Sequence, residues 1–365
     1  MALKCGIVGL PNVGKSTLFN CLSKAKAQSA NFPFCTIEPN IGVISVPDDR
    51  LDALSSLVKP ERVIPTTVEI VDIAGLVKGA SKGEGLGNKF LANIRETNAI
   101  IHVLRCFDDD NIIHVDGSID PVRDKQTIDM ELQLKDLETL EKIRDKNARS
   151  AESGDKVAQK LIATIKKYIS HLENGNSVRS LNTNKEEAEI IDGLCLITAK
   201  PVLYMCNVDE GSVKEGNKHV EAVKQAVKHE DAQVIIIATG IEAEIAELKD
   251  LEEQEMFLAE LELEKPGVHY LIQSTYKLLN LQTYFTAGEK EVRAWTITKG
   301  TKAPKAAAVI HTDFEKGFIR AEVMSYADFI RLGSEQACRD AGKLSVEGKD
   351  YLVQDGDIMH FRFNV

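Results

Sequence analysis

The sequence has few of the features that mark membrane, secreted or metal-binding proteins. None of its apolar runs is long enough to span a bilayer, and it enters a strand-like run without the regions typical of a signal peptide. Its seven cysteines lack C-x-x-C spacing, and no histidine cluster lies near them. These absences argue against a membrane protein, a disulfide framework and a zinc site. We expect a cytoplasmic protein with reduced thiols.

Positive charge is also scarce. The 365 residues include 45 Lys and Arg against 56 Asp and Glu, for a net charge of −11. Such a chain is a poor ligand for bare nucleic acid, and we expect no sequence-specific DNA binding. The acidic excess lies upstream, because the sequence from residue 280 onward holds twelve basic and twelve acidic residues. That neutral segment can approach RNA where the acidic remainder cannot.

Residues 9–17 (GLPNVGKST) lie between a predicted strand and a predicted helix. In that context G-x-x-x-x-G-K-S is typical of a phosphate-binding loop, in which backbone N–H groups, the helix dipole and a lysine surround the phosphates. The alternative is a glycine turn that merely joins strand to helix. We assign the outer phosphates to Lys15 and a Mg²⁺ ligand to Ser16. The predicted nucleotide-binding residues of the loop are Asn12, Val13, Gly14, Lys15, Ser16 and Thr17.

Two later motifs extend this site. Thr36 lies in a proline-bounded segment and is a candidate second hydroxyl ligand for Mg²⁺, although it could be an ordinary loop threonine. The D-x-x-G motif at 72–75 ends a predicted buried strand. It places the Asp72 carboxylate in the outer shell of the metal and the N–H of Gly75 against the γ-phosphate. We expect the glycine-rich stretch that follows to order around that phosphate and to relax after hydrolysis.

Leu76 occupies the position where many related nucleotidases carry the glutamine that orients the attacking water. An aliphatic side chain cannot orient water, so another group acts, or hydrolysis is slow until a partner binds. His114 lies in a polar loop from which it could swing toward the phosphates. We therefore add it, with a structural role as the alternative, to the candidate catalytic residues Lys15, Asp72 and Gly75.

Residues 207–210 (NVDE) stand where a guanine-specific protein has N-K-x-D. Val208 replaces the lysine, and Glu210 replaces the aspartate that accepts two hydrogen bonds from guanine. The extra methylene of glutamate would misplace that carboxylate, so guanine recognition is weakened. Residues 239–241 (TGI) also lack the S-A-K of many GTPases. We predict that Asn207 and Val208 line the base.

Helical periodicity runs from about residue 127 to 173, with a break at 153–155. It predicts an antiparallel helical hairpin inserted into the nucleotide domain. A capping box at 183–186 predicts another helix, to about residue 197. From residue 280 onward, alternating apolar positions predict a small mixed sheet with a helix near 326–331. The apolar stripes of the hairpin are Met130, Leu134, Leu137, Leu140 and Ile143 on one helix, and Val157, Leu161, Ile165, Ile169 and Leu172 on the other.

Four segments together carry a family resemblance. Residues 9–17, 31–40 (NFPFCTIEPN), 72–80 (DIAGLVKGA) and 280–288 (NLQTYFTAG) resemble the corresponding motifs of the YchF or Obg-like ATPase family. The last segment is similar to the opening of a TGS module, and the resemblance extends over the whole chain. It implies an α/β fold in which a P-loop nucleotidase domain, residues 1–279, carries the helical hairpin at about 125–199. A C-terminal TGS domain of the β-grasp type then spans residues 280–365.

The resemblance also implies an activity. Members of the family hydrolyse ATP with Mg²⁺, prefer ATP to GTP and associate with ribosomes, and we expect the contact on the large subunit. Translation control and stress responses are the implied settings. The basic residues of the hairpin, together with Lys299, Lys302 and Lys305, are candidate ribosome contacts. The alternatives are a GTPase with relaxed base recognition and a ribosome or RNA adaptor that does not hydrolyse nucleotide.

Overall fold

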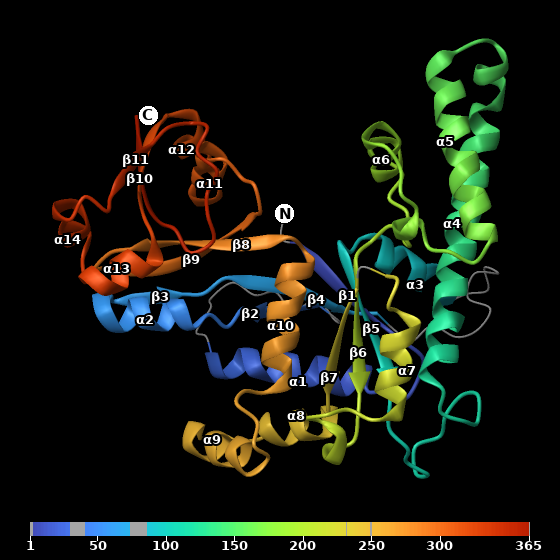
Figure 1. Cartoon of the computed structure of the whole chain (residues 1–365), viewed down its shortest axis with the longest axis horizontal. Coiled ribbons are helices and arrows are strands. Elements are labelled where there is room, and N and C mark those ends of the chain that lie inside the picture. The colour runs from blue at the N-terminus through green and yellow to red at the C-terminus, as the bar shows by residue number, and fades with distance from the viewer. Residues whose placement is uncertain (1–2, 30–40, 74–85, 231, 249, 365) are drawn as a thin grey trace. The chain divides into compact units, whose positions relative to one another are not determined.

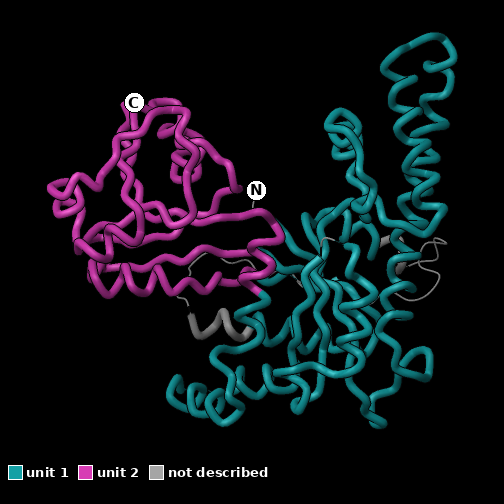
Figure 2. The backbone as a smooth tube through the Cα atoms, in the orientation of Figure 1, with its two compact units in different colours: residues 1–42, 69–271 teal, residues 43–68, 272–365 magenta. Residues whose placement is uncertain are grey.

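The computed structural model describes residues 3–29, 41–73, 86–230, 232–248 and 250–364 (Figure 1). The chain divides into two compact units, one made of residues 1–42 and 69–271 and the other of residues 43–68 and 272–365 (Figure 2). Residues 43–68 therefore belong to the C-terminal unit, although in sequence they lie within residues 1–279, the predicted nucleotide domain. Within the described part, no helix is long and apolar enough to cross a membrane.

The first unit is built on a six-stranded sheet in the order β2-β4-β1-β5-β6-β7. The five strands from β4 to β7 are parallel, as predicted for an α/β nucleotide domain. Strands β5 and β6 are buried along their whole length, which is typical of a parallel sheet covered on both faces. The strands are β1 (Lys4–Val8), β2 (Ile41–Ser45), β4 (Thr67–Asp72), β5 (Ala99–Arg105), β6 (Val202–Asn207) and β7 (Gln233–Ile237).

Helices follow most of these strands. Their order after the strands gives the crossover connections that a parallel sheet requires. The helices from the first strand to the end of this region are α1 (Lys15–Ser29), α3 (Leu86–Arg95), α4 (Pro121–Glu152), α5 (Lys156–Glu173), α6 (Lys185–Asp192), α7 (Lys218–Ala226), α8 (Thr239–Ile245), α9 (Leu251–Glu260) and α10 (Gly267–Leu278).

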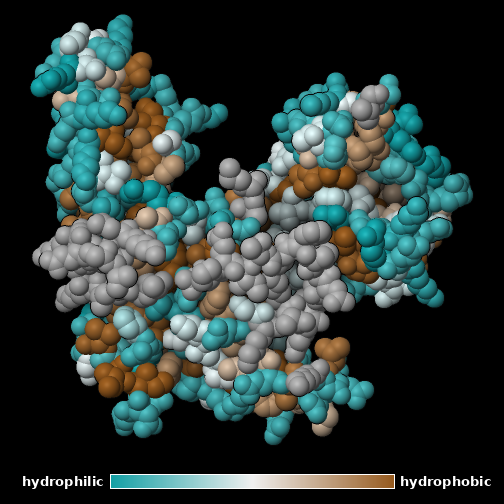
Figure 3. All heavy atoms as spheres, turned by 180° about the vertical axis from the view of Figure 1, so that it is seen from behind, coloured by the Kyte–Doolittle hydropathy of each residue, from teal (hydrophilic) through white to brown (hydrophobic). Residues whose placement is uncertain are grey.

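The helical hairpin is confirmed in α4 and α5, which lie side by side and extend from the sheet (Figure 1). Helix α4 begins at Pro121, several residues earlier than periodicity indicated. The side chain of Asp120 accepts hydrogen bonds from two first-turn N–H groups, and proline suits the first helical position. Figure 3 shows hydrophilic side chains over much of the outer surface of the hairpin, with apolar atoms gathered between them.

The predicted apolar stripe of α4 is partly wrong. Met130 and Leu134 are exposed, whereas Ile128 and Leu132 are buried. The physical reason is that α4 packs against β5 and α7 as well as against α5, and the cluster that it shares with α5 is built around Leu140. The helix therefore buries a different face along its length than a two-helix hairpin alone requires.

A buried carboxylate anchors the middle of α4. Asp136 accepts hydrogen bonds from the N–H of Ile197 at 2.8 Å and from the N–H and hydroxyl of Thr198, each at 2.7 Å. These partners lie just before β6, so one side chain ties the long helix to the point where the chain returns to the sheet. Buried backbone N–H groups need such acceptors, because water cannot reach them.

The predicted helix after the capping box is shorter than expected. Asn184, rather than Thr183, caps α6 by accepting a hydrogen bond from the N–H of Glu187, and α6 ends at Asp192. Cys195 has a φ of 51°, a left-handed conformation that does not continue an α-helix. The segment from 193 to 200 instead leads the chain to β6.

The second unit contains a mixed six-stranded sheet in the order β11-β10-β12-β8-β9-β3, which confirms the mixed sheet predicted for the C-terminal region. Strand β3 joins its edge by pairing in parallel with β9, a long-range pairing that explains why residues 43–68 belong here. The strands are β3 (Arg62–Ile64), β8 (Leu281–Ala287), β9 (Glu291–Thr298), β10 (Phe318–Met324), β11 (Ser345–Glu347) and β12 (Ile358–Phe363).

Apolar clusters cover both faces of this sheet, because neighbouring residues on a strand point to opposite sides. Tyr284 packs in a cluster with the alanines of α11, whereas Phe285 packs with Leu51 and Leu54 of α2 and with Phe329 of α13. The helices are α2 (Asp49–Val58), α11 (Ala303–Ile310), α12 (Thr312–Lys316), α13 (Tyr326–Leu332) and α14 (Glu335–Asp340).

We predict that Asp136→Ala loosens the base of the hairpin locally. Two buried N–H groups and one hydroxyl lose their acceptor, at a cost of roughly 1–3 kcal/mol for each group left unpaired. Hydrogen exchange should therefore speed up at the amides of Ile197 and Thr198 by about tenfold or more. Asp145→Ala is the matched control, since Asp145 lies on the same helix and its side chain is exposed. Equal protection in the two variants would show that Asp136 is not the anchor.

Candidate nucleotide-binding site

The predicted phosphate-binding loop connects β1 to α1 at the carboxyl edge of the parallel sheet. Two of its glycines are required sterically. A Cβ on Gly9 would lie 2.5 Å from the carbonyl oxygen of Val103, and a Cβ on Gly14 would lie 2.4 Å from the side-chain nitrogen of Asn207. Both glycines have positive φ, as does Asn12 at 62°. The loop is therefore shaped by close backbone approach, as a phosphate cradle requires.

Lys15 starts helix α1 and is buried, although it carries the charge predicted to meet the phosphates. Its ammonium group donates a hydrogen bond to the carbonyl oxygen of Leu10 at 2.6 Å. Burial lowers the pKa of Lys15 to about 8, and the charge of Asp72 only partly opposes this effect. The neighbouring residues of the first turn, Ser16 and Thr17, are exposed and thus accessible to a ligand.

Asp72 ends strand β4 beside the loop. Its Oδ1 atom is buried and has no hydrogen-bond partner among the described residues. Desolvation raises the pKa of this carboxyl, while the charge of Lys15 lowers it. An orphaned carboxylate oxygen next to a phosphate loop fits the outer-shell position predicted for Mg²⁺. The other predicted partners, Thr36 and Gly75, lie outside the described residues, as does Leu76.

Asn207 holds the loop from the end of strand β6. Its side-chain amide donates a hydrogen bond to the carbonyl oxygen of Val13 at 2.9 Å, and its side-chain oxygen accepts one from the N–H of Thr239 at 3.0 Å. Both ends of the side chain therefore bind protein. Val208 is buried and bonds through its N–H to the carbonyl oxygen of Ile237. The predicted contact of these residues with the base stays a prediction, whereas the role of Asn207 in fixing the loop is visible.

His114 is buried rather than free in a polar loop. Its Nε2 lies 2.8 Å from Oδ2 of Asp124, and its Nδ1 accepts a hydrogen bond from the N–H of Asp116 at 3.1 Å. An imidazole that accepts at Nδ1 carries its proton on Nε2, so Nε2 donates to Asp124. The adjacent residue, Ile113, accepts a hydrogen bond at its carbonyl oxygen from the side chain of Asn12 at 3.1 Å. The histidine is thus held next to the phosphate loop, with both ring nitrogens engaged.

Two residues that support this arrangement were missed by sequence reasoning. Arg105 is buried at the end of β5 and donates hydrogen bonds to the carbonyl oxygens of Phe107, Asp109 and Ile112, which fixes the loop before His114. Asp124 lies in the first turn of α4. The Asp-Pro pair at 120–121 is a helix-start signal that could have placed Asp124 there, but no sequence signal pairs it with His114.

Two family models match parts of this chain. A family model named for the C-terminal part of YchF GTPases, and described as a protein of unknown function, matches residues 281–364. A second model, described as a 50S ribosome-binding GTPase, matches residues 4–149.

Several relatives match over the full length of both chains. Proteins named ribosome-binding ATPase YchF are 59% identical in Haemophilus ducreyi and 52% identical in Bacillus subtilis, with complete coverage of this chain and of the relative. A solved structure of the Schizosaccharomyces pombe YchF GTPase superposes with a TM-score of 0.90 and 41% identity, and covers 99% of this chain and 97% of that one.

The buried position of Lys15 predicts a pH dependence of nucleotide binding. Phosphates bind the protonated lysine, so at a pH above its pKa of about 8 the binding of MgATP must take up a proton. At pH 9 we expect uptake of about 0.9 proton, and affinity should fall by about tenfold for each further pH unit. Calorimetry in two buffers of different ionisation heat measures the uptake. Equal heats in both buffers at pH 9 would mean that Lys15 is already charged in the free protein.

Proposed function

Because the chain belongs to the YchF family, we propose that it is a ribosome-binding ATPase, which hydrolyses ATP to ADP and phosphate and uses the reaction as a conformational switch linked to translation or stress responses. The observation that carries this proposal is the phosphate loop that holds the buried Lys15 beside a carboxylate oxygen of Asp72 that no described residue satisfies. Ribosome-binding ATPase is also the name of the full-length relatives.

Each residue of the loop has a distinct role in this proposal. Lys15 and the backbone N–H groups of residues 12–17 bind the phosphates, and Gly75 contacts the γ-phosphate. Ser16 and Thr36 are the proposed Mg²⁺ ligands, and Asp72 supports the ion from the outer shell. When bound, the ion supplies positive charge that stabilises the phosphate oxygens. The Asp72 oxygen, which has no hydrogen-bond partner in the part of the chain that the structure describes, fits such a role.

ATP is proposed rather than GTP because two residues of the guanine-reading motif N-K-x-D are replaced in this chain. Val208 is buried and apolar, and Glu210 is exposed, so neither reproduces the lysine and aspartate of a guanine-reading motif. Names among the relatives differ on this point, since the bacterial proteins are named ATPases and the S. pombe structure a GTPase. A GTPase with relaxed base recognition is therefore the second candidate.

His114 is proposed to replace the missing glutamine. In the described arrangement its Nε2 donates to Asp124, so it cannot orient water until this bond opens. Release of the ring would bring a proton acceptor toward the γ-phosphate from a position already adjacent to Asn12. Asp124 then acts as a positioning residue that keeps the ring away in the resting state.

The ribosome is the proposed partner, with the large subunit as the contact and the cytoplasm as the location. The hairpin offers one surface, and several of its basic residues already pair with acidic neighbours: Lys142 with Glu138, Arg144 with Asp145, and Lys167 with Glu187. The sheet of the C-terminal unit offers a second surface, and its assignment as a TGS module of the β-grasp type belongs to this proposal. A ribosome adaptor that does not hydrolyse nucleotide is a further candidate, because both ring nitrogens of His114 are engaged.

We predict that Lys15→Ala abolishes tight binding of MgATP, because the outer phosphates lose the lysine of the loop. The matched control is Lys200→Ala, since Lys200 is half-buried and, like Lys15, donates to a backbone carbonyl, that of Arg95, at the opposite edge of the sheet. Calorimetric titration with MgATP and MgGTP, and turnover with and without ribosomes, measure the effects.

A preference for GTP of about tenfold, or 1.4 kcal/mol, would favour the GTPase. No turnover in either condition would favour the adaptor.

A further prediction concerns His114→Ala. Turnover at saturating ATP should fall by roughly a hundredfold if the ring acts on the attacking water, while ATP affinity stays the same. His171→Ala serves as the control, because this histidine also bonds through Nε2 but lies on the hairpin. If His114→Ala lowers only the thermal stability, the residue is a structural support for the loop.

A further inference from the structure

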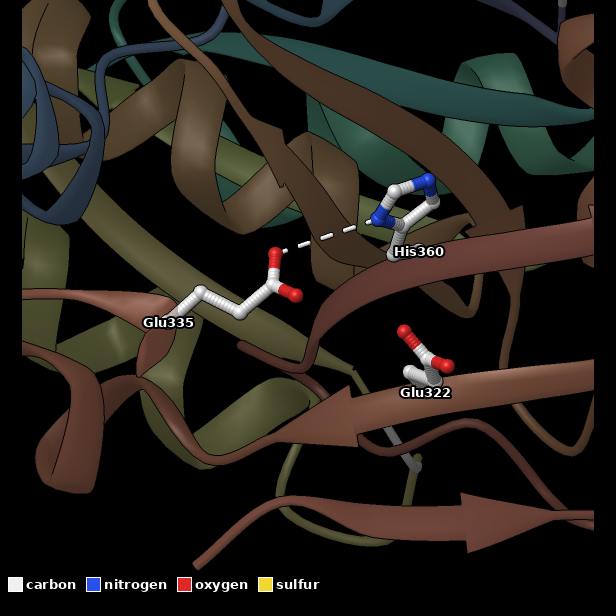
Figure 4. Close-up of side chains that lie close together, drawn as sticks. All are labelled: Glu322, Glu335 and His360. Carbon is white, nitrogen blue, oxygen red and sulfur yellow. Dashed lines mark ion pairs between the residues drawn. The ribbon is translucent and has the colours of Figure 1, made fainter. Parts of the chain in front are cut away.

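A cluster of charged side chains on the C-terminal sheet has no place in the nucleotide chemistry. Glu322 on β10, Glu335 on α14 and His360 on β12 bring their possible ligand atoms within 4.8 Å of one another (Figure 4). Such a set could hold a metal ion by composition alone. The surroundings argue otherwise, because three arginines approach the same glutamate.

These arginines fill the position that a cation would take. The carboxylate of Glu322 lies 3.1 Å from Arg362, 3.5 Å from Arg320 and 3.5 Å from Arg339. Glu335 is likewise paired, with Arg339 at 3.0 Å and with His360 at 3.8 Å. A divalent ion would have to enter among three guanidinium groups that repel it. The cluster therefore holds arginines rather than a metal.

Two of these arginines are placed so that their charges repel each other. Arg320 and Arg362 lie directly opposite each other on the antiparallel strands β10 and β12. Like charges at such cross-strand positions are destabilising. The negative charge of Glu322 offsets this repulsion. Its side chain is only 3% exposed, and the hydrogen bond from Arg362 keeps the pKa of this carboxyl below its ordinary value.

The guanidinium groups themselves face solvent. Their side chains are 52%, 46% and 44% exposed for Arg320, Arg339 and Arg362. Each guanidinium has five N–H donors, and the contacts with Glu322 and Glu335 use only some of them. Glu322 thus holds three half-exposed arginines close together. Their N–H donors suit the oxygens of a phosphate group.

We propose that Arg320, Arg339 and Arg362 form a binding surface for the phosphate backbone of RNA. In the cell this RNA would be ribosomal, so that part of the inference rests on the proposed function. Residues 280–365 are neutral overall while the whole chain carries −11, so this region repels RNA less than the rest of the chain does, and the exposed arginines supply local positive charge. Lysines on the same unit fit less well. Lys302 and Lys305 each pair with a separate acid, Asp350 and Glu315, both at 2.6 Å.

The test variant replaces the three arginines by glutamine together with Glu322→Gln. The fourth change is needed because removal of the arginines alone would leave a buried, unpaired carboxylate and could unfold the unit. The control variant is Lys316→Gln with Lys343→Gln and Lys349→Gln, which replaces three exposed lysines that were not candidate ribosome contacts. It removes three positive charges from the same unit, whereas the test variant changes net charge by only two. ATP turnover without ribosomes and thermal unfolding should match the wild type in both variants.

Full-length proteins are then titrated with purified ribosomes and with protein-free ribosomal RNA over a salt series. We expect the test variant to bind both about tenfold or more weakly than the wild type. Its dependence of log affinity on log salt should also be shallower, by about 0.7 for each RNA phosphate that the arginines no longer neutralise. The lysine control should keep nearly the wild-type slope.

The outcomes separate the two proposals. If the wild type binds ribosomes and the test variant binds them equally well, the arginine surface is wrong and ribosome binding stands. If the wild type fails to bind ribosomes, the proposed function is wrong, and arginine-dependent binding of protein-free RNA still supports the surface. If the test variant loses ribosomes but binds protein-free RNA like the wild type, the occupant is an acidic protein and the RNA assignment is overturned.

Discussion

The side-chain amide of Asn207 joins three parts of the nucleotide site. It extends from the end of β6, donates to the carbonyl oxygen of Val13 in the phosphate loop and accepts from the N–H of Thr239 at the start of α8. This bridge, together with the hydrogen bond from Asn12 to the carbonyl oxygen of Ile113, restrains a loop whose glycines have the greatest conformational freedom of any residue. The same contact explains why Gly14 cannot carry a side chain, since a Cβ there would meet the Asn207 amide.

Two titratable groups, Lys15 and Asp72, are already in place in the site before a ligand binds. Lys15 is buried against a backbone carbonyl, and the nearby Asp72 has an oxygen that no described residue satisfies. Burial disfavours the charged form of both groups, which lowers the pKa of the lysine and raises that of the carboxyl. Phosphate and a metal ion would relieve both penalties together. The free energy stored in desolvation is therefore available for binding.

The sequence indicates those features of this protein that depend on local pattern. Glycine spacing identifies the phosphate loop, apolar runs identify the parallel strands, and periods of three and four identify the hairpin. Contacts between distant segments have no such signal. Pairing of β3 with β9 joins residues more than two hundred positions apart, and the bond between His114 and Asp124 depends on where α4 begins. Met130 and Leu134 were wrongly predicted to lie in the buried stripe for a related reason, because α4 packs against β5 and α7 as well as against α5.

Helix α4 links the loop of His114 to the hairpin because it is unbroken from Pro121 to Glu152. Its first turn carries Asp124, which holds His114, and its middle carries Asp136, which anchors the base of the hairpin. The two carboxylates are twelve residues apart, or about 18 Å along the helix at 1.5 Å per residue. A continuous helix resists compression over that length. The helix is therefore tied to the nucleotide domain at two points a fixed distance apart, to the loop of His114 through Asp124 and to the segment before β6 through Asp136.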